Sequence, residues 1–60
     1  MTDPYFKLRL VRHLKCALNS YQALIVETKL DPQHNEKILQ IVIDARQDAE
    51  DILKQVEKMP

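Results

Sequence analysis

The stretch Leu-Asp-Pro-Gln at residues 30–33 divides a chain of 60 residues into two halves. No glycine occurs anywhere in the chain, and Pro32 is the only proline between Pro4 and Pro60. Proline disfavours the helical conformation in the residue before it, so a helix in the first half is expected to end at this stretch. The sequence therefore predicts an all-α chain that is interrupted once, near its middle.

The dipeptide Asp-Pro occurs at residues 31–32 and also at residues 3–4. An aspartate at the N-cap accepts hydrogen bonds from free amide groups of the first turn, and proline at the first helical position loses no hydrogen bond. Reading both dipeptides as helix starts predicts helices over 4–29 and 32–58, joined by a turn at 30–31. Two long helices with so short a connection form an antiparallel two-helix hairpin, a single domain over the whole chain.

Apolar side chains recur along both halves with helical and heptad spacing. In the first half, projection at 100° per residue gives a broad apolar face made of Phe6, Leu10, Val11, Leu14, Ala17, Leu18, Tyr21, Leu24 and Ile25. In the second half, steps of three and four give a coiled-coil-like seam made of Ile38, Val42, Ala45, Ala49, Ile52, Val56 and Met59. These two faces are expected to pack against each other.

Several apolar residues do not fit these faces and predict a partner-binding surface. The candidate residues are Tyr5, Leu8, Val26, Leu30, Leu39 and Ile43. Antiparallel pairing brings the last four together at the turn end of the hairpin, and the first two form a smaller patch at the other end. Because clustered exposed apolar side chains are typical of an interface, we expect a partner or a second copy to bind there.

The size and the charge of the chain support this expectation. Two helices that touch along one line bury little apolar surface, so a chain this small is expected to complete its core with a partner or as a dimer. Residues 1–30 carry five basic and two acidic side chains, a balance of +3, and residues 31–60 carry four basic and seven acidic ones, a balance of −3. Opposite charges favour antiparallel pairing, and a formal net charge of zero argues against nucleic acid as a partner.

Residues that support catalysis or cofactor binding are sparse, so we expect neither an enzyme nor a bound cofactor. His13 and His34 fall in different segments, without the spacing of a metal site. The absence of glycine excludes a phosphate-binding loop. Cys16 is the only cysteine, which favours a reducing compartment and leaves its role open between a reactive thiol and a tolerated surface residue. Without an apolar run of about 18 residues or a signal peptide, we expect a cytoplasmic location and no membrane.

A short basic strip keeps one alternative open. Arg9, Arg12, His13 and Lys15 could contact RNA phosphates, and small dimeric four-helix bundles that bind RNA have this size. No aromatic side chain is interleaved with these residues to stack on bases. A regulator of a larger protein is a further alternative that the sequence does not separate from an adaptor.

The second half resembles a known family. The stretch 30–33, the aliphatic ridge after it, and then Ala45, Ala49-Glu50 and Ile52-Leu53 look like the second helix of the small co-chaperones of type III secretion needle subunits. The resemblance covers residues 8–56 as a pattern and residues 30–53 as similar residues. Many members have a tyrosine shortly after the glutamine of the turn, where this chain has a histidine and an asparagine.

The resemblance implies a fold and a function. Members of that family are helical hairpins that dock on a larger chaperone of the tetratricopeptide type. Together the two proteins hold the needle subunit soluble and monomeric until it is exported. On this resemblance we expect the chain to be a non-catalytic bacterial co-chaperone, with the dimeric RNA-binding or regulatory bundle as the alternative.

Overall fold

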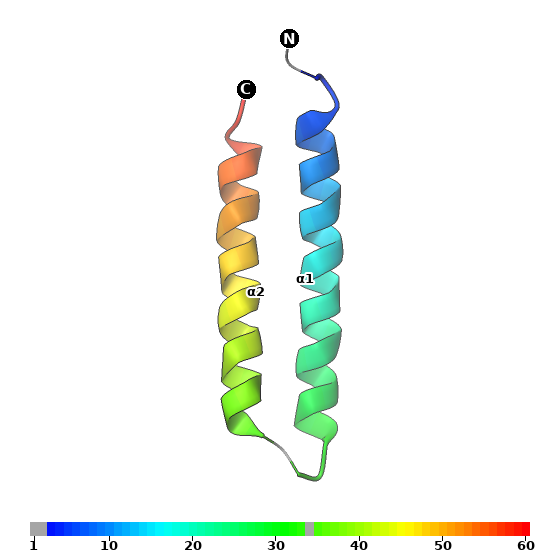
Figure 1. Ribbon diagram of the computed structural model, residues 1–60, viewed down its shortest axis with the longest axis vertical. Helices are drawn as coiled ribbons and strands as arrows, with labels where there is room; N and C mark the ends of the chain where they lie inside the picture. Colours follow the sequence, from blue (N-terminus) through cyan, green and yellow to red (C-terminus); the bar gives the residue numbers. More distant parts are fainter. Residues whose placement is uncertain (1–2, 34) are drawn as a thin grey trace.

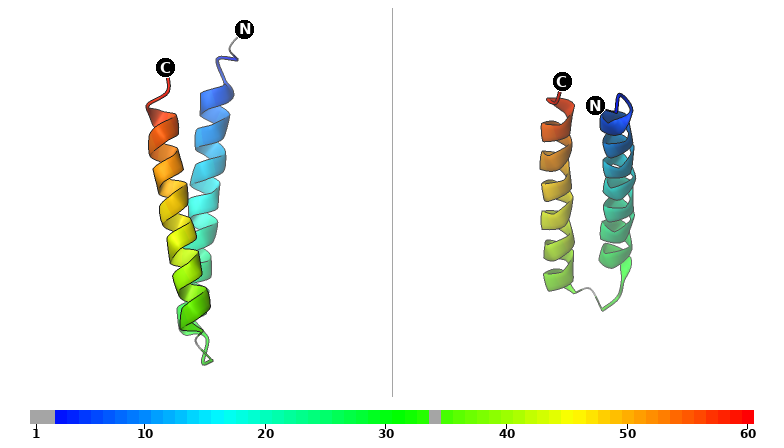
Figure 2. Two further views of the ribbon diagram at one scale, coloured as in Figure 1. Left: turned by 60° about the vertical axis from the view of Figure 1, so that its left-hand side comes forward. Right: turned by 45° about the horizontal axis from the view of Figure 1, so that its top comes forward.

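A computed structural model describes residues 3–33 and 35–60 of the chain. Helix α1 runs over Phe6–Leu30 and helix α2 over Glu36–Glu57. The two helices are antiparallel and lie side by side, with both chain termini at the end opposite the loop (Figures 1 and 2). The hairpin is long and thin, with extents of 51 × 14 × 13 Å. The predicted all-α antiparallel two-helix hairpin is confirmed.

The contact between the helices follows one heptad stripe on each of them, which we call the seam. In α1 the seam consists of Lys7, Val11, Leu14, Leu18, Tyr21, Ile25 and Thr28. In α2 it consists of Leu39, Val42, Arg46, Ala49, Leu53 and Val56. Each of these side chains is buried or half-buried, and they are spaced by alternating steps of three and four as in a coiled coil. Among the described residues, Ile25, Val42, Ala49 and Val56 are the buried core.

The predicted seam of α2 is correct at three positions and wrong at others. Val42, Ala49 and Val56 are buried as expected, but Ile38 and Ile52 are about half exposed. Leu39, expected to point away from α1, lies in the seam instead. The charge of Arg46 explains the error. A seam predicted without Arg46 passes through positions 38, 45 and 52, each one residue before the true seam positions 39, 46 and 53. In α1 the predicted face was too broad, since Phe6 and Leu24 are also exposed.

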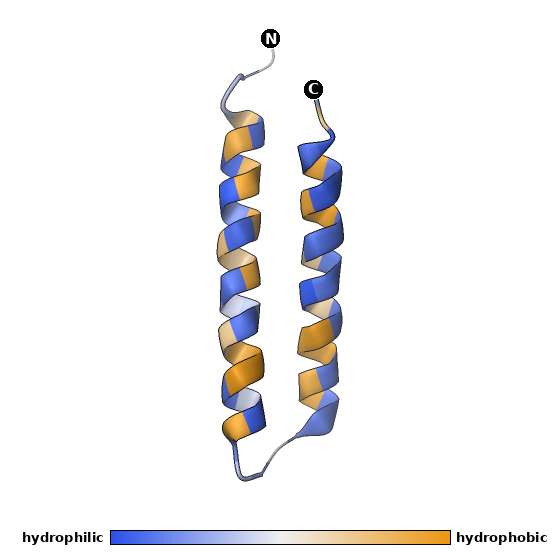
Figure 3. Ribbon diagram, turned by 180° about the vertical axis from the view of Figure 1, so that it is seen from behind, coloured by the Kyte–Doolittle hydropathy of each residue, from blue (hydrophilic) through white to orange (hydrophobic). Residues whose placement is uncertain are grey.

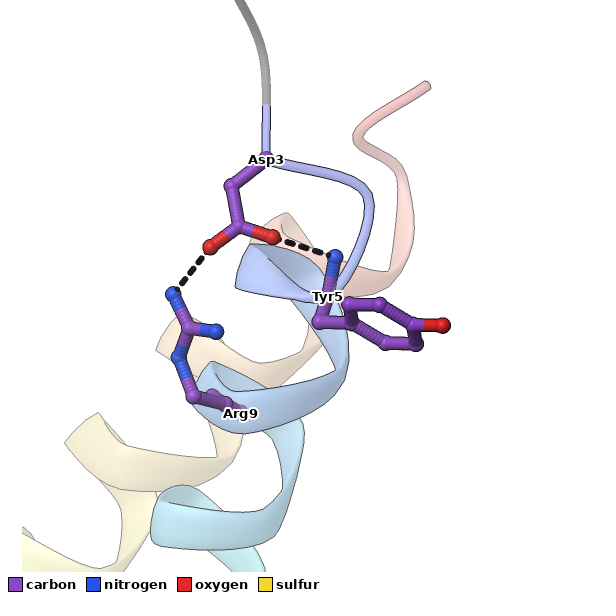
Figure 4. A network of polar contacts seen from close by, with 3 residues as sticks. All are labelled: Asp3, Tyr5 and Arg9. Carbon is purple, nitrogen blue, oxygen red and sulfur yellow. Dashed lines mark hydrogen bonds and ion pairs between the residues drawn. The ribbon is translucent and has the colours of Figure 1, made fainter.

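The first helix begins two residues later than predicted, at Phe6. Asp3 does not cap it: the Oδ1 atom of Asp3 accepts a hydrogen bond of 2.8 Å from the Tyr5 amide, which closes a local turn before the helix. The Oδ2 atom of Asp3 lies 2.6 Å from Nη2 of Arg9 (Figure 4). Tyr5 occupies the N-cap position without a capping side-chain bond, so Asp3 holds the first turn from outside.

The connection is longer than the predicted turn at 30–31, because α2 begins at Glu36 rather than at Pro32. Asp31 is the C-cap of α1 in an extended conformation, as expected for a residue before proline. Its Oδ1 atom accepts a hydrogen bond of 2.9 Å from the Gln33 amide. The N-cap of α2 is Asn35, whose Oδ1 atom accepts from the amides of Lys37 and Ile38 at 3.1 Å.

A cross-helix contact closes the open end of the hairpin. Nζ of Lys7 donates to the carbonyl oxygens of Glu57, at 3.0 Å, and Met59, at 2.8 Å. Carbonyl groups at a helix C-terminus have no partner within the helix and carry a partial negative charge, which favours a cation there. The lysine at the first seam position of α1 therefore caps the end of α2.

Candidate partner-binding surface

The exposed surface of the hairpin is rich in large apolar side chains. Among the described residues, four apolar side chains are buried and eleven large ones are exposed. The exposed ones are Tyr5, Phe6, Leu8, Leu24, Val26, Leu30, Ile38, Ile41, Ile43, Ile52 and Met59. Single exposed apolar residues are normal, but a contiguous group of them is typical of an interaction site. The arrangement of these residues therefore decides what the surface can do.

A second stripe of apolar residues runs along each helix beside the seam, interrupted by polar residues at positions 13, 20 and 27 of α1 and 48 and 55 of α2. On α2 it consists of Ile38, Ile41, Ala45 and Ile52. On α1 it consists of Phe6, Leu10, Ala17 and Leu24. Each residue of these stripes directly precedes a seam residue in the sequence, so each stripe lies along one flank of the seam. Because the helices are antiparallel, these two flanks lie on the same side of the hairpin. We call these eight residues the apolar face.

The seam fixes which residues of the apolar face are neighbours. The bonds of Lys7 to the carbonyls of Glu57 and Met59 place position 7 level with positions 57–59. Counting equally along both helices from there, Leu24 comes level with Ile41. In Figure 3 the widest hydrophobic bands of both helices lie in the half next to the loop. Near the loop the apolar face contains Leu24, which is 42% exposed, and Ile41, which is 60% exposed.

The residues predicted to bind a partner were expected in two patches, one at the turn end and a smaller one at the open end. Tyr5 is exposed just before α1, and Leu8, Val26 and Ile43 are exposed at helical positions on the side opposite the apolar face. Leu8 and Val26 are 18 residues apart, about 27 Å along the helix, with polar residues between them. Leu30 is exposed at the end of α1 beside the loop. Leu39 is half-buried in the seam, so it is not part of an exposed surface.

Sequence reasoning missed the residue with the most exposed side chain on the apolar face, Ile41. It also assigned Ile38 and Ile52 to the seam, although they are 50% and 53% exposed. The steps from position 38 to 41, from 41 to 45 and, seven residues later, to 52 would have revealed a second stripe. A helix with two adjacent heptad stripes can contact two neighbouring helices at once, whereas a two-helix hairpin supplies only one.

The part of the chain that is described contains no pocket and no group of three His, Cys, Asp or Glu side chains that could hold a metal ion. His34 lies outside the described residues. Cys16 is an exposed free thiol. In the basic strip, Arg9 is paired with Asp3. The pKa of the Asp3 carboxyl is lowered mainly by the Arg9 guanidinium and, to a smaller extent, by the hydrogen bond from the Tyr5 amide.

One polar side chain lies within the seam. Nη1 of Arg46 is 2.6 Å from Oε1 of Glu50, one turn further along α2. Nε of Arg46 is buried and has no hydrogen-bond partner among the described residues. A buried donor without a partner lowers stability. The seam is therefore interrupted near its middle by a charged side chain with one buried donor that lacks a partner in the described part of the chain.

Comparison with known proteins gives no match: no protein-family model, no curated protein and no solved structure matches the chain. Neither helix of the described chain has the length and apolarity of a membrane span.

Proposed function

We propose that this hairpin is a non-catalytic protein-binding module and that its apolar face docks on a helical partner. The observation that carries the proposal is that apolar face, which leaves Ile38, Ile41 and Ile52 at least half exposed on one side of α2. Because these isoleucines are already about half covered, burying the rest of each is worth about half of the ~1.5–3 kcal/mol of a fully exposed side chain. A partner helix laid along this face would obtain that energy.

The spacing of the apolar face specifies the shape of the partner. Steps of three and four residues are what one helix presents to another, because the side chains then interdigitate along a common line. Since α1 and α2 contribute parallel rows on the same side, the partner surface is itself a helix or a pair of helices. Binding of a helix to an apolar groove between helices is a common mode of recognition.

The family resemblance gives this module its specific form. We propose a bacterial cytoplasmic co-chaperone that docks on a larger tetratricopeptide-type chaperone and helps keep a type III secretion needle subunit soluble before export. A tetratricopeptide-type chaperone is built of helix pairs, which matches the helical partner that the apolar face requires. The residues supporting this form are those of the resemblance at 30–53 together with the exposed isoleucines of α2.

The test is a binding titration with matched variants. A purified tetratricopeptide-type chaperone of a type III secretion system from the source cell, alone and with its needle subunit, is titrated with the hairpin. Ile41→Glu with Ile52→Glu changes the apolar face, and Leu8→Glu with Val26→Glu changes similarly exposed residues on the opposite side. We expect the first pair to weaken binding at least about 100-fold, because a charge is placed in the centre of the contact.

The opposite-side variant is expected to bind within about threefold of the unchanged chain, as is usual outside an interface core. Equal loss in both variants, or none in either, would contradict docking through the apolar face. Binding to RNA that weakens with salt and is lost in Arg9→Ala with Arg12→Ala would instead support the RNA-binding alternative.

A further inference from the structure

We infer that, in the free protein, a second copy of this chain covers the apolar face, so that two hairpins form a two-fold symmetric four-helix bundle. This goes beyond the proposed function, because it names the occupant of the face when no other partner is bound. Three observations support a second copy: the accessible surface area, the position of the two stripes, and the distribution of charge.

The accessible surface is larger than a compact protein of this mass would have. The hairpin exposes 5056 Å². A compact folded monomer of 7.1 kDa exposes about 4,100 Å². The difference of about 1,000 Å² is close to the ~800 Å² that each partner buries in a standard protein–protein interface. Loss of that area against one further hairpin would bring the chain to the surface expected of a folded protein.

The two stripes of the apolar face have the arrangement that a symmetric contact requires. In a two-fold contact the same patch is used on both copies, so it must be complementary to itself. The apolar face consists of one row on α1 and one on α2, both on the same side, with apolar residues at heptad positions that His13, Ser20 and Asp48 interrupt. Turning a second hairpin over onto this face lays rows on rows, which is the arrangement of a four-helix bundle.

The distribution of charge selects one of the two possible orientations. Residues 1–30 have a balance of +3 and residues 31–60 a balance of −3. If the loops of the two copies lie at the same end, α1 of each copy contacts α2 of the other, and opposite charges meet. If the loops lie at opposite ends, α2 contacts α2 and like charges meet. The charges therefore favour the bundle with both loops at one end.

In this orientation the loop-end part of the apolar face meets the same part of the second copy. Leu24 of one copy comes level with Ile41 of the other, because the two-fold axis runs parallel to the helices and leaves positions along them unchanged. The loop ends of the two hairpins thus share one apolar cluster. The opposite side of each hairpin, with Leu8 and Val26, stays exposed in the bundle.

The first experiment is sedimentation equilibrium of the purified chain from about 1 to about 500 μM, with circular dichroism of the same samples. We expect a dimer. Ile41→Glu with Ile52→Glu should raise its dissociation constant at least about 100-fold, and Leu8→Glu with Val26→Glu should change it less than about threefold. A monomer throughout this range would overturn the inference. Because binding to another protein is measured separately, that result would leave the proposed function standing.

A second experiment remains decisive if the glutamate variant unfolds. In a Cys16→Ser background, one preparation carries Leu24→Cys and another carries Ile41→Cys, and the two are mixed and oxidised. We expect the mixed disulfide to exceed either disulfide between identical chains, because only α1-to-α2 contact between copies brings these positions together. Random proportions of the three products, or a preference for identical chains, would overturn the proposed orientation.

Discussion

Two stripes of the same spacing run along α2, but their chemistry and exposure differ. The stripe in the seam contains Arg46 and the small Ala49, whereas the stripe of the apolar face carries three isoleucines. The hairpin thus leaves three isoleucines exposed on α2 while a charged side chain occupies the middle of its seam. If folding of the isolated hairpin alone had determined the sequence, the isoleucines would be expected in the seam. Their exposed position is what the proposed intermolecular contact requires.

The strongest comparison of the two stripes uses the neighbours Ile41 and Val42. Val42→Glu places a charge without a partner in the seam and should destabilise the hairpin by about 3 kcal/mol or more, with loss of its helical circular dichroism at every concentration. Ile41→Glu should keep helicity at concentrations where the unchanged chain is monomeric and lower it only where that chain associates. Equal loss for both variants at all concentrations would remove the distinction between the stripes.

A change at Asn35, the N-cap before both stripes of α2, gives a reference value for the loss of stability. Asn35→Ala removes the N-cap bonds to Lys37 and Ile38 and should lower the free energy of unfolding by about 1 kcal/mol. Asp31→Ala, which removes the bond to the Gln33 amide in the loop, should cost less. Urea unfolding of the three proteins checks the order. A larger loss for Asp31→Ala would indicate that Asp31, as the sequence predicted, and not Asn35 is the N-cap of α2.

Making the seam apolar tests why it is interrupted. Arg46→Leu removes the buried Nε that lacks a partner and should raise the free energy of unfolding by up to about 1 kcal/mol. Glu50 keeps access to water after the change, since its side chain is 31% exposed. Arg46→Gln is the control, because it removes the charge but keeps a polar group. A loss of stability for leucine would show that the pair of Arg46 with Glu50 supports the seam.

The smallest effect concerns Asp3, before the first turn of α1. Arg9 and the Tyr5 amide hold the pKa of its carboxyl below the ordinary value of 3.8, so the folded state favours the carboxylate. The resulting stabilisation is present above pH 3.8 and disappears as the pH falls through the lower pKa of the folded state. Asp3→Asn should remove this acid dependence, as measured by the amide chemical shift of Tyr5 between about pH 2 and pH 6.

The sequence was sufficient to predict the two helices, their antiparallel pairing and the break before Pro32. It was not sufficient to place the helix starts, because Asp31 and Asn35 are both good N-cap residues and only the three-dimensional loop decides between them. The seam predicted for α2 was displaced because the true repeat includes the charged Arg46, which the prediction left out. Because Ile38 and Ile52 had been assigned to that seam, the row that they form with Ile41 was not recognised, and Ile41 was missed although it lies outside the predicted seam.

The contact of Lys7 with the end of α2 has a consequence for the alignment of the helices. Stripes that repeat every seven residues would still match, over most of their length, if one helix slipped by one heptad, about 10 Å. Such a slip would carry the ammonium group of Lys7 away from the carbonyls of Glu57 and Met59 and leave it beside apolar side chains. A single lysine thus removes a degeneracy that the repeating apolar pattern leaves, and makes one register lower in energy than its shifted copies.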